Sequence, residues 1–542
     1  MPLLVAAGII ALGSLLPLLY LLVRALEGGE QALAPLWRPR TLLLLRNTLT
    51  LAAAVTLSAT LMSLPLAWLT VRTDLPGRRL WSVVAALPIA VPSYVGAFTA
   101  VAAFGPRGAL QQLLEPILGI ERFPEIYGFT GAWLVLTLYT YPYIYLSLRG
   151  VIGSLDPALE EAARSLGHGP WSTFFRVTLP QLRPAMASGA LLTSLYVLSD
   201  FGAVSLLNYD AFTRAIYNQY RLAFDRSGAA SLALVLATLT ILIVAVERAW
   251  RGPQRYHRSF AGGHRPLRLI RLGRWTPAGI AYCGGLGLLT LGTPLAVTSY
   301  WLVQAIRSGN PLALTWQAAW HSAVISLLTA VVTVVVAFPV AFLLVRSSGL
   351  ASRLIEFPLW ISYALPGIVT ALALVSFGAR YLVPLYQTFA LLLLAYVIRF
   401  LPEAVGSLRA SLLQVSPRLE EAARGLGSSP LRAWLRVTAP LLSPGIVSGS
   451  TLVFLTTVKE LPVTLLLSPI GYGTLATEVW NATRELFWSH AALPAFLLFL
   501  VAALPTALLT WRQQLVDRQE GAPPREPSST ARTSGTPGRL VA

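Results

Sequence analysis

The segment EEAARSLGHGPWSTFFRVTLP at residues 160–180 returns 260 residues later, at 420–440, as EEAARGLGSSPLRAWLRVTAP. A second pair of segments also repeats: LPLAWLTVR at 64–72 matches FPVAFLLVR at 338–346, with an offset of 274 residues. Self-similarity over such long segments means that the chain contains the same structural unit twice. The sequence therefore predicts two halves that are built alike and inserted in the same orientation.

The two offsets differ by 14 residues, and this difference indicates where the halves differ in length. The dipeptide VP at 91–92 matches LP at 365–366 at the larger offset, so the first half gains its extra residues after this point. We expect them in a longer loop around 105–129.

The composition is that of a membrane protein. Of the 542 residues, 55% are hydrophobic and 12% charged, whereas soluble domains carry about 25% charged residues. Apolar runs of about twenty residues recur along the chain, each long enough to cross a hydrocarbon core of about 30 Å. The predicted fold is an all-α membrane protein with about twelve transmembrane helices in two parallel six-helix repeats. The predicted spans are residues 2–23, 48–71, 81–104, 130–148, 184–207, 229–249, 277–304, 318–345, 354–377, 387–407, 444–468 and 489–511.

The basic residues indicate topology and argue against nucleic-acid binding. The net charge of +18 comes almost entirely from arginines between or beyond the apolar runs, and no basic face interleaved with aromatic side chains occurs. Four Arg-bearing connections, 72–80, 149–183, 250–275 and 408–442, fall on one side of the membrane if the predicted spans hold. The positive-inside rule makes that side cytoplasmic, so both termini are predicted to be cytoplasmic.

These features divide the chain. We expect a first transmembrane domain at 1–250, a cytoplasmic Arg-rich linker at 251–275, a second transmembrane domain at 276–512, and a disordered cytoplasmic tail at 513–542. The first apolar run has no basic n-region and no clear cleavage site, so it is predicted to be a retained helix and not a signal peptide. Cys283 is the only cysteine, which excludes a disulfide framework and a Cys-rich metal site.

The first copy of the duplicated segment has the pattern of a helix–glycine–helix element outside the membrane. Asp156 is placed to cap a helix whose first residue is Pro157. Glutamates in the early turns complement the helix dipole, and the alanines leave a surface of small side chains that another protein can approach closely. Gly167 tolerates the positive φ that ends such a helix, and a second short helix is expected from Pro170 to Pro180.

A docking surface explains this element better than a plain linker, because a linker does not require two near-identical copies. The candidate docking residues are Glu160, Glu161, Ala162, Ala163, Gly167 and Pro180 in the first copy and Glu420, Glu421, Ala422, Ala423, Gly427 and Pro440 in the second. The first copy resembles the EAA loop of bacterial ABC importer permeases. It has Glu-Ala-Ala, then a glycine six residues after the glutamate, then Val177 two residues before a Leu-Pro pair. The second copy departs from this pattern at Ala439, which replaces the leucine.

The resemblance implies a type I importer permease of the fused form. Its two EAA loops would form coupling helices in grooves on two copies of a separate ABC ATPase subunit, which would bind ATP and Mg. This chain would then bind no cofactor and would not be an enzyme. The sequence agrees, because it has no Gly-rich loop of the GxxxxGKS kind and its only lysine is Lys459. The resemblance also implies a multi-pass protein of the bacterial cytoplasmic (inner) membrane, in contact with lipid and with a periplasmic or lipid-anchored substrate-binding protein.

Charged residues inside the spans are candidates for a substrate pathway. Asp200 in the fifth span and Glu460 in the eleventh are equivalent at the offset of 260 residues, and each precedes a residue that weakens a helix, Gly202 or Pro462. Lys459 precedes Glu460. We hypothesise that the two acids face each other across a central pathway. The alternative is that Lys459 and Glu460 pair structurally with other helices, for example with Arg399 and Glu403.

The segments KELPVTLLLSPIGYGTLATEVW at 459–480 and SDFGAVSLLNYDAFTRAIY at 199–217 resemble the permeases of ferric-iron importers. Related subfamilies of the same architecture import thiamine, 2-aminoethylphosphonate, polyamines or sulfate. The five histidines are scattered, so no iron site can be identified from the sequence. The alternative of another class is a twelve-helix secondary transporter, in which buried acids couple transport to an ion gradient. A secondary transporter has no need of the duplicated loop, so the loop argues against this alternative.

Overall fold

A computed structural model describes residues 2–27, 29, 38–105, 108, 111, 115, 125–251, 269–309, 313–347 and 349–520. Within these ranges the regular structure is helical, and the only β contact is an isolated parallel bridge between Thr73 and Ile270. The predicted all-α membrane architecture with two similar halves is therefore confirmed for the described part of the chain.

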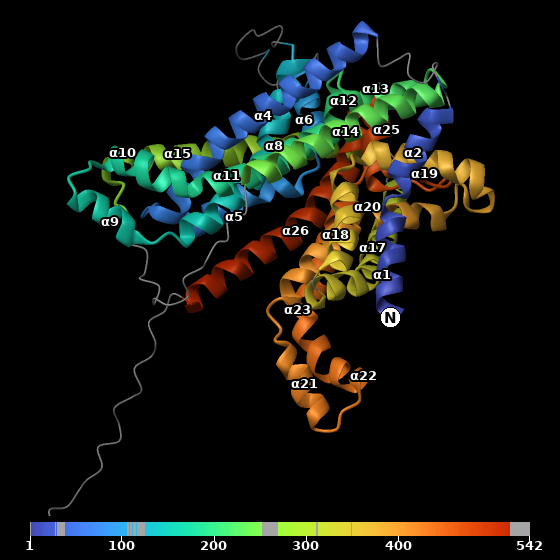
Figure 1. The fold of residues 1–542 in the computed structure, drawn as a ribbon. Helices are drawn as coiled ribbons and strands as arrows, with labels where there is room; N and C mark the ends of the chain where they lie inside the picture. The colour runs from blue at the N-terminus through green and yellow to red at the C-terminus, as the bar shows by residue number, and fades with distance from the viewer. Residues whose placement is uncertain are drawn as a thin grey trace, which may run out of the picture.

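The first half runs from α1 to α14 and the second from η4 to α26 (Figure 1). The elements of the first half are α1 (Pro2–Ser14), α2 (Leu16–Glu27), α4 (Pro39–Arg72), α5 (Arg78–Ala86), η2 (Leu87–Ala90), α6 (Ser93–Phe104), α8 (Phe129–Gly153), α9 (Pro157–Ser165), α10 (Pro170–Thr173), η3 (Phe174–Thr178), α11 (Leu179–Ser199), α12 (Gly202–Leu206), α13 (Phe212–Arg221) and α14 (Arg226–Arg251). Those of the second are η4 (Gly273–Trp275), α15 (Thr276–Gly287), η5 (Leu288–Gly292), α16 (Thr293–Arg307), α17 (Ala313–Arg346), α18 (Leu350–Ala364), α19 (Gly367–Tyr381), η6 (Val383–Leu385), α20 (Phe389–Leu412), α21 (Pro417–Gly425), α22 (Pro430–Ala433), η7 (Trp434–Thr438), α23 (Ala439–Val458), α24 (Pro462–Leu467), α25 (Leu475–Arg484) and α26 (Trp488–Glu520).

Every predicted span coincides with a described helix or helix pair. By length and composition, seven described helices can cross a membrane, and up to ten spans result if each of three bent pairs is one span. Helices α8 and α11 are not among these, although they occupy the predicted fourth and fifth spans. Their positions in the first half correspond to those of α20 and α23 in the second, and both of those helices are long and apolar enough to cross a membrane.

Two predicted spans, 81–104 and 354–377, are interrupted by sharp bends. The chain bends by 95° between Ala90 and Ser93 and by 104° between Ala364 and Gly367. The bends fall at the VP and LP dipeptides that marked the repeat. The residue before a proline is driven out of the α region, and Val91 and Leu365 accordingly adopt ψ angles of 121° and 126°. The first predicted span is also bent, by 46° between α1 and α2.

The two halves exchange their first helices. Helix α1 packs against α17 and α18 of the second half, while α15 and α16 pack against α5 and α6 of the first. One large apolar core contains residues from both halves, and Phe201 lies against Trp480 with a ring-centre distance of 4.9 Å. Neither half is therefore a separate packing unit.

Two short helices, α13 and α25, were not predicted. They follow the broken fifth and eleventh spans and lie at the end of the molecule away from α9, α10, α21 and α22 (Figure 1). Each has ten residues and a strongly amphipathic sequence, so neither produces an apolar run of transmembrane length. They mark the face opposite the duplicated loops.

The boundaries of the predicted domains need one correction. Helix α26 continues to Glu520, so the predicted disordered tail is wrong for residues 513–520. Residues 521–542, most of the linker and much of the loop around 105–129 lie outside the described residues. The described end of the linker returns to the first half, because the Ile270 N–H donates to the Arg72 carbonyl at 2.8 Å.

Candidate functional site

Each duplicated loop folds as two short helices joined at a glycine. Gly167 and Gly427 both have a φ of +87°, a conformation that other residues adopt only with strain. In the first loop, the N–H groups of Gly167 and His168 donate to the carbonyls of Arg164 and Ala163, at 3.0 and 3.1 Å. The second loop has the equivalent bonds at the same lengths. The prediction that glycine ends the first short helix is confirmed in both copies.

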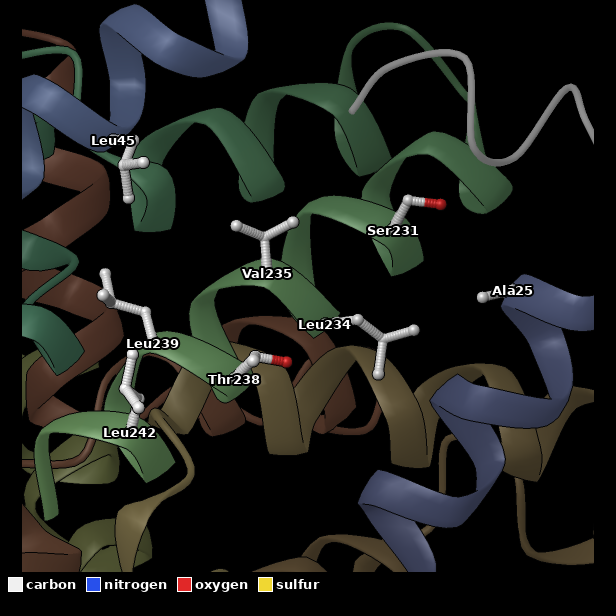
Figure 2. A pocket seen from close by; sticks show the side chains of 8 residues that line it. All are labelled: Ala25, Leu45, Ser231, Leu234, Val235, Thr238, Leu239 and Leu242. Atoms are coloured by element: carbon white, nitrogen blue, oxygen red, sulfur yellow. The ribbon is translucent and has the colours of Figure 1, made fainter. Parts of the chain in front are cut away.

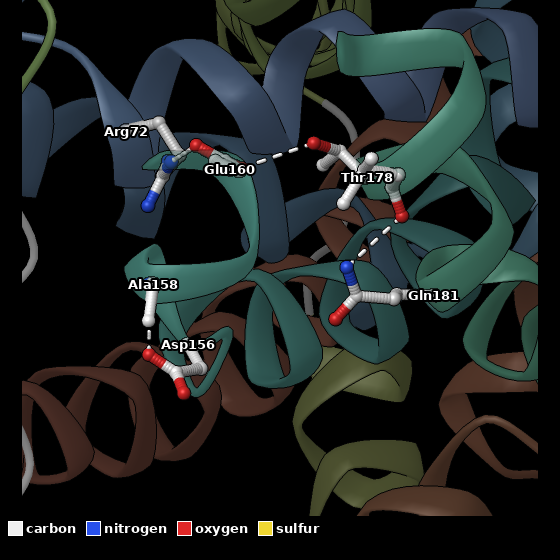
Figure 3. A network of polar contacts seen from close by, with 7 residues as sticks. Arg72, Asp156, Ala158, Glu160, Thr178 and Gln181 are labelled. Atoms are coloured by element: carbon white, nitrogen blue, oxygen red, sulfur yellow. Dashed lines mark hydrogen bonds and ion pairs between the residues drawn. The ribbon is translucent and has the colours of Figure 1, made fainter. Parts of the chain in front are cut away.

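The helix start predicted from Asp156 is also confirmed. Its carboxylate accepts a hydrogen bond from the N–H of Ala158 at 2.9 Å, and Pro157 follows it as the first helical residue (Figure 3). Ser416 occupies the same place in the second loop but makes no side-chain cap bond. The first loop is therefore the better capped of the two.

A buried ion pair fixes the first loop to the membrane domain. Arg72, the last residue of α4, pairs with Glu160 of α9, and their side chains are 4% and 11% exposed (Figure 3). The hydroxyl of Thr178 donates to the other oxygen of Glu160 at 3.0 Å. The guanidinium of Arg72 also lies 5.4 Å from the ring centre of Trp68. Glu160, predicted as a docking residue, thus faces inward and positions the loop.

The second loop lacks this attachment. Glu420 accepts a hydrogen bond from Thr438 at 3.3 Å, which repeats the contact of Thr178. Arg346, the counterpart of Arg72 in the repeated segment, forms no ion pair with it, and its Nη2 atom is buried without a partner. The two loops are alike in backbone but differ in how firmly the glutamate holds them.

The outward face of the loops is apolar and exposed. Leu166 and Leu426, at equivalent positions just before the glycines, are 80% and 89% exposed. Trp171 is 76% exposed and stacks on Phe175. Glu161, Ala162, Glu421 and Ala422 are also exposed, whereas Ala163 is buried. Exposed apolar side chains that form a contiguous patch are typical of protein–protein contact.

The second short helix does not end where the sequence suggested. Pro180 and Pro440 were expected to close it, but α10, η3 and α11 follow one another without a gap from Pro170 to Ser199. Both prolines lie in the first turn of the next α-helix, where a missing N–H costs nothing. The junction is a π-helical turn in both copies, and Gln181 donates to the Val177 carbonyl at 2.9 Å beside it (Figure 3). Each loop is therefore continuous with a helix that occupies a predicted span, α11 or α23.

The predicted helix breaks after the buried acids are present. Helix α11 ends at Ser199 and α12 begins at Gly202, while α23 ends at Val458 and α24 begins at Pro462. A Cβ atom on Gly202 would lie 2.6 Å from the Cβ of Tyr94, so only glycine permits this close approach to α6.

Asp200 is fully engaged in holding its helix break. Its carboxylate accepts hydrogen bonds from the N–H groups of Ala203 and Val204, at 3.0 and 3.3 Å, and another from the hydroxyl of Ser93. Its backbone carbonyl accepts from Thr213 at 2.6 Å. Asp200 therefore acts as a cap for α12 and ties it to α6 and α13.

Glu460 occupies the equivalent position but lacks an equivalent partner. Gly367 stands where the first half has Ser93, and the Oε1 atom of Glu460 is buried without a hydrogen bond. A Cβ atom on Gly367 would lie 2.7 Å from that oxygen and 3.6 Å from the guanidinium of Arg399, whose Nε atom is also unpartnered. The two halves thus differ at the same place by one missing hydroxyl.

The other charges of the centre bind backbone and hydroxyl groups. Lys459 donates to the carbonyl of Ile89 in the first half at 3.0 Å, and Arg399 donates to the carbonyl of Leu365. Glu403 accepts from Thr456 at 3.1 Å. No direct ion pair joins these charges, although Arg399 and Lys459 lie close enough to Glu460 to interact with it electrostatically. Whether Asp200 and Glu460 serve a pathway stays a prediction.

Two grooves are lined mainly by apolar side chains, and none of the charged residues of the centre lines either of them. One, of about 370 Å³, runs between α2, α4 and α14 and is lined almost wholly by apolar side chains such as Leu45, Leu234 and Leu242 (Figure 2). The other, of about 360 Å³, contacts α17 and α26 and includes Trp316 and Trp320. Such linings suit lipid chains better than a charged or polar cargo.

Sequence reasoning missed the residues that hold the loops and line the centre. Arg72 and Arg346 were visible as the last residues of the repeated LPLAWLTVR and FPVAFLLVR segments, but nothing local joined them to the glutamates. The tyrosines near Glu403 and Glu460 carry no distinct sequence signal, because aromatic residues are common in spans.

The chain matches one protein family twice. The family is described as binding-protein-dependent transport system inner membrane component, and the matches cover residues 56–249 and 333–520. Each match contains one duplicated loop and the helices around it.

Known relatives agree with this match. The chain is 34% identical to an Fe(3+)-transport system permease protein of Haemophilus influenzae, over 92% of this chain and 96% of that protein. It is 25% identical to a ferric transport system permease protein of Actinobacillus pleuropneumoniae, over 78% of this chain and 64% of that protein. A molybdenum transport system permease protein of Escherichia coli is 32% identical over 37% of this chain and 95% of its own length. A whole permease of that kind therefore corresponds to less than half of this chain.

Proposed function

The chain belongs to the family of binding-protein-dependent transport system inner membrane components, and we propose that it forms the translocation pathway of an ATP-driven importer of ferric iron. As a member of this family it is an ABC-type permease whose two repeats are fused in one chain. In this proposal the substrate arrives on a periplasmic or lipid-anchored binding protein at the face of α13 and α25. The duplicated loops and both termini lie on the cytoplasmic side of the inner membrane.

The proposed coupling to a separate ATPase rests on the duplicated loops. Two loops with the same backbone present exposed apolar side chains and exposed glutamates, which suits two copies of one partner. Each loop is continuous with α11 or α23, so a push on the loop is transmitted to a helix that ends at the centre of the molecule. ATP and Mg would be bound by the partner.

The proposed cargo rests on one observation above others. A relative that covers 92% of this chain at 34% identity is an Fe(3+)-transport permease. The molybdenum relative covers only about one repeat. Thiamine, 2-aminoethylphosphonate, polyamine and sulfate are the alternatives for the same architecture.

Reconstitution tests both parts of this proposal. The permease, the ABC ATPase and the binding protein encoded with it are placed in proteoliposomes, and uptake of radioactive ferric iron is measured with and without ATP. We expect uptake that requires ATP, both partner proteins and the ATPase on the loop side. Uptake driven by an ion gradient without the ATPase would contradict the proposal, and uptake of sulfate or thiamine in place of iron would change the cargo.

A further inference from the structure

The repeat brings one tyrosine and one glutamate together at the centre. Tyr143 of α8 and Glu403 of α20 are equivalent at the offset of 260 residues. The two side chains lie close enough that the carboxylate of Glu403 affects the ionisation of Tyr143. Tyr363 of α18 interacts with both of them. Equivalent residues of two parallel repeats approach one another only near the pseudo-two-fold axis that relates the halves. Tyr143 and Glu403 therefore lie near that axis.

A second tyrosine of the first half extends this group. The rings of Tyr143 and Tyr196 have their centres 5.6 Å apart, and Tyr196 also interacts electrostatically with Asp200 and Glu460. The residue equivalent to Tyr196 is Thr456, which donates to Glu403 at 3.1 Å. We call Tyr143, Tyr196, Tyr363 and Glu403 the axial oxygen cluster. Two of its members belong to each half.

The cluster is not completely enclosed by the protein. All four side chains are only half-buried, although each has a neighbour from the opposite half. In contrast, Tyr141 and Tyr145 on the other side of α8 are fully buried. The cluster therefore lies between the halves and keeps part of its surface accessible.

Unpartnered polar atoms next to the cluster give an independent observation. Tyr94 is 3% exposed, its hydroxyl has no hydrogen-bond partner, and it interacts electrostatically with Tyr196 and Glu460. The Oε1 atom of Glu460 is also buried without a partner. Buried polar atoms without hydrogen-bond partners cost free energy, so they indicate a ligand or water that supplies the missing hydrogen bonds.

We propose that the axial oxygen cluster is the point where the cargo, a hard trivalent cation, is bound in transit between the halves. This inference rests on the proposed function. Phenolic and carboxylate oxygens are hard ligands of the kind that such a cation prefers. Each phenol that coordinates the cation releases its proton to water.

The chemistry of the cluster suits brief binding. Within the described residues no group of three His, Cys, Asp or Glu side chains could hold a metal ion, so strong chelation by the usual ligands is absent there. The nearby cations Arg399 and Lys459 bind the carbonyls of Leu365 and Ile89 and offset the charge of the glutamates. A transit site must bind its cargo strongly enough to admit it and weakly enough to release it.

Absorption spectroscopy tests the cluster directly. The full chain in complex with its ATPase, in lipid nanodiscs, is titrated with ferric nitrilotriacetate. We expect a phenolate-to-iron charge-transfer band in the visible range, weakened by at least about tenfold in Tyr143→Phe and Tyr363→Phe, with iron uptake reduced to a similar extent. Glu403→Gln should weaken iron binding likewise while binding-protein-stimulated ATPase activity is kept.

Tyr145→Phe is the matched control, because Tyr145 is on the same helix, is fully buried and contacts Thr70 at 3.1 Å. It should leave the band and the uptake unchanged. If the wild-type complex imports iron but shows no band, the transit-site proposal is overturned and the proposed function stands. If the wild-type complex imports no iron, both are overturned.

Discussion

Single residues show that the two loops are not interchangeable. Glu160 makes a buried ion pair with Arg72, whereas Glu420 makes only a hydrogen bond to Thr438 and leaves Arg346 unpaired. Removing one member of a buried pair leaves an uncompensated charge, which costs about 3 kcal/mol, while losing a single hydrogen bond costs about 1 kcal/mol. We therefore predict that Glu160→Ala lowers the Tm of the purified permease clearly more than Glu420→Ala does. Equal losses would mean that the ion pair does not stabilise the first loop.

A second residue-scale difference concerns the hydroxyl that Glu460 lacks. We predict that Gly367→Ser gives Glu460 the hydrogen bond that Ser93 gives Asp200, and raises the Tm by the equivalent of about 1 kcal/mol. The new Cβ atom would lie 2.7 Å from Oε1, but that oxygen is at the end of a flexible side chain and can move. Gly367→Ala is the control, since it adds the Cβ atom without the hydroxyl. A serine variant no more stable than the alanine variant would refute the assignment.

At the scale of elements, much of the architecture was predictable. The duplicated segment predicted both loops, the cap at Asp156 and the glycine turns, because capping and positive φ are local properties of the chain. The helix breaks at Gly202 and Pro462 were predicted for the same reason. The sharp bends at Pro92 and Pro366 were missed because a bent pair and a straight span have the same apolar length.

The partners of the loops and of the central charges could not be predicted. Arg72 and Glu160 are 88 residues apart, and Lys459 and Ile89 are 370 apart, so their contacts arise only from packing. The exchange of first helices between the halves is likewise a property of packing, which no local pattern records. This is why Glu160 was grouped with docking residues although it points inward.

The loops themselves carry a prediction about docking. Leu166 and Leu426 are exposed at equivalent positions and have no structural contact to lose, so we predict that the double variant Leu166→Ser, Leu426→Ser folds normally. It should bind the ATPase more weakly, because burial of two leucines contributes about 1.5–3 kcal/mol each at an interface. Co-purification of the ATPase and transport-coupled hydrolysis measure this. As a control, Leu452→Ser changes an exposed leucine on α23, outside the loop. Undiminished co-purification of the double variant would exclude these leucines from the docking surface.

At the scale of the whole molecule, the two ends of the helix bundle are distinct. At the loop end, α9 and α10 lie at the tip of one arm and α21 and α22 at the tip of another, while α13 and α25 lie away from both tips (Figure 1). The arginine-bearing ends of α4 and of the linker meet at the loop end, where the Asp74 carboxylate accepts from the N–H of Leu272 at 2.8 Å. From the positive-inside rule we predict that the loop end is cytoplasmic.

Cysteine labelling tests this orientation with little background, because the only native cysteine, Cys283, is buried. Leu166→Cys and Leu426→Cys place a thiol at the loop end, and Phe224→Cys and Ile470→Cys place one near α13 and α25, all at positions at least 80% exposed. We predict that a membrane-impermeant maleimide labels the second pair in spheroplasts and the first pair only after the membrane is permeabilised. The reverse pattern would invert the molecule and place both loops out of reach of a cytoplasmic ATPase. Labelling of one member of each pair would show that the halves are inserted in opposite orientations, which the parallel repeat forbids.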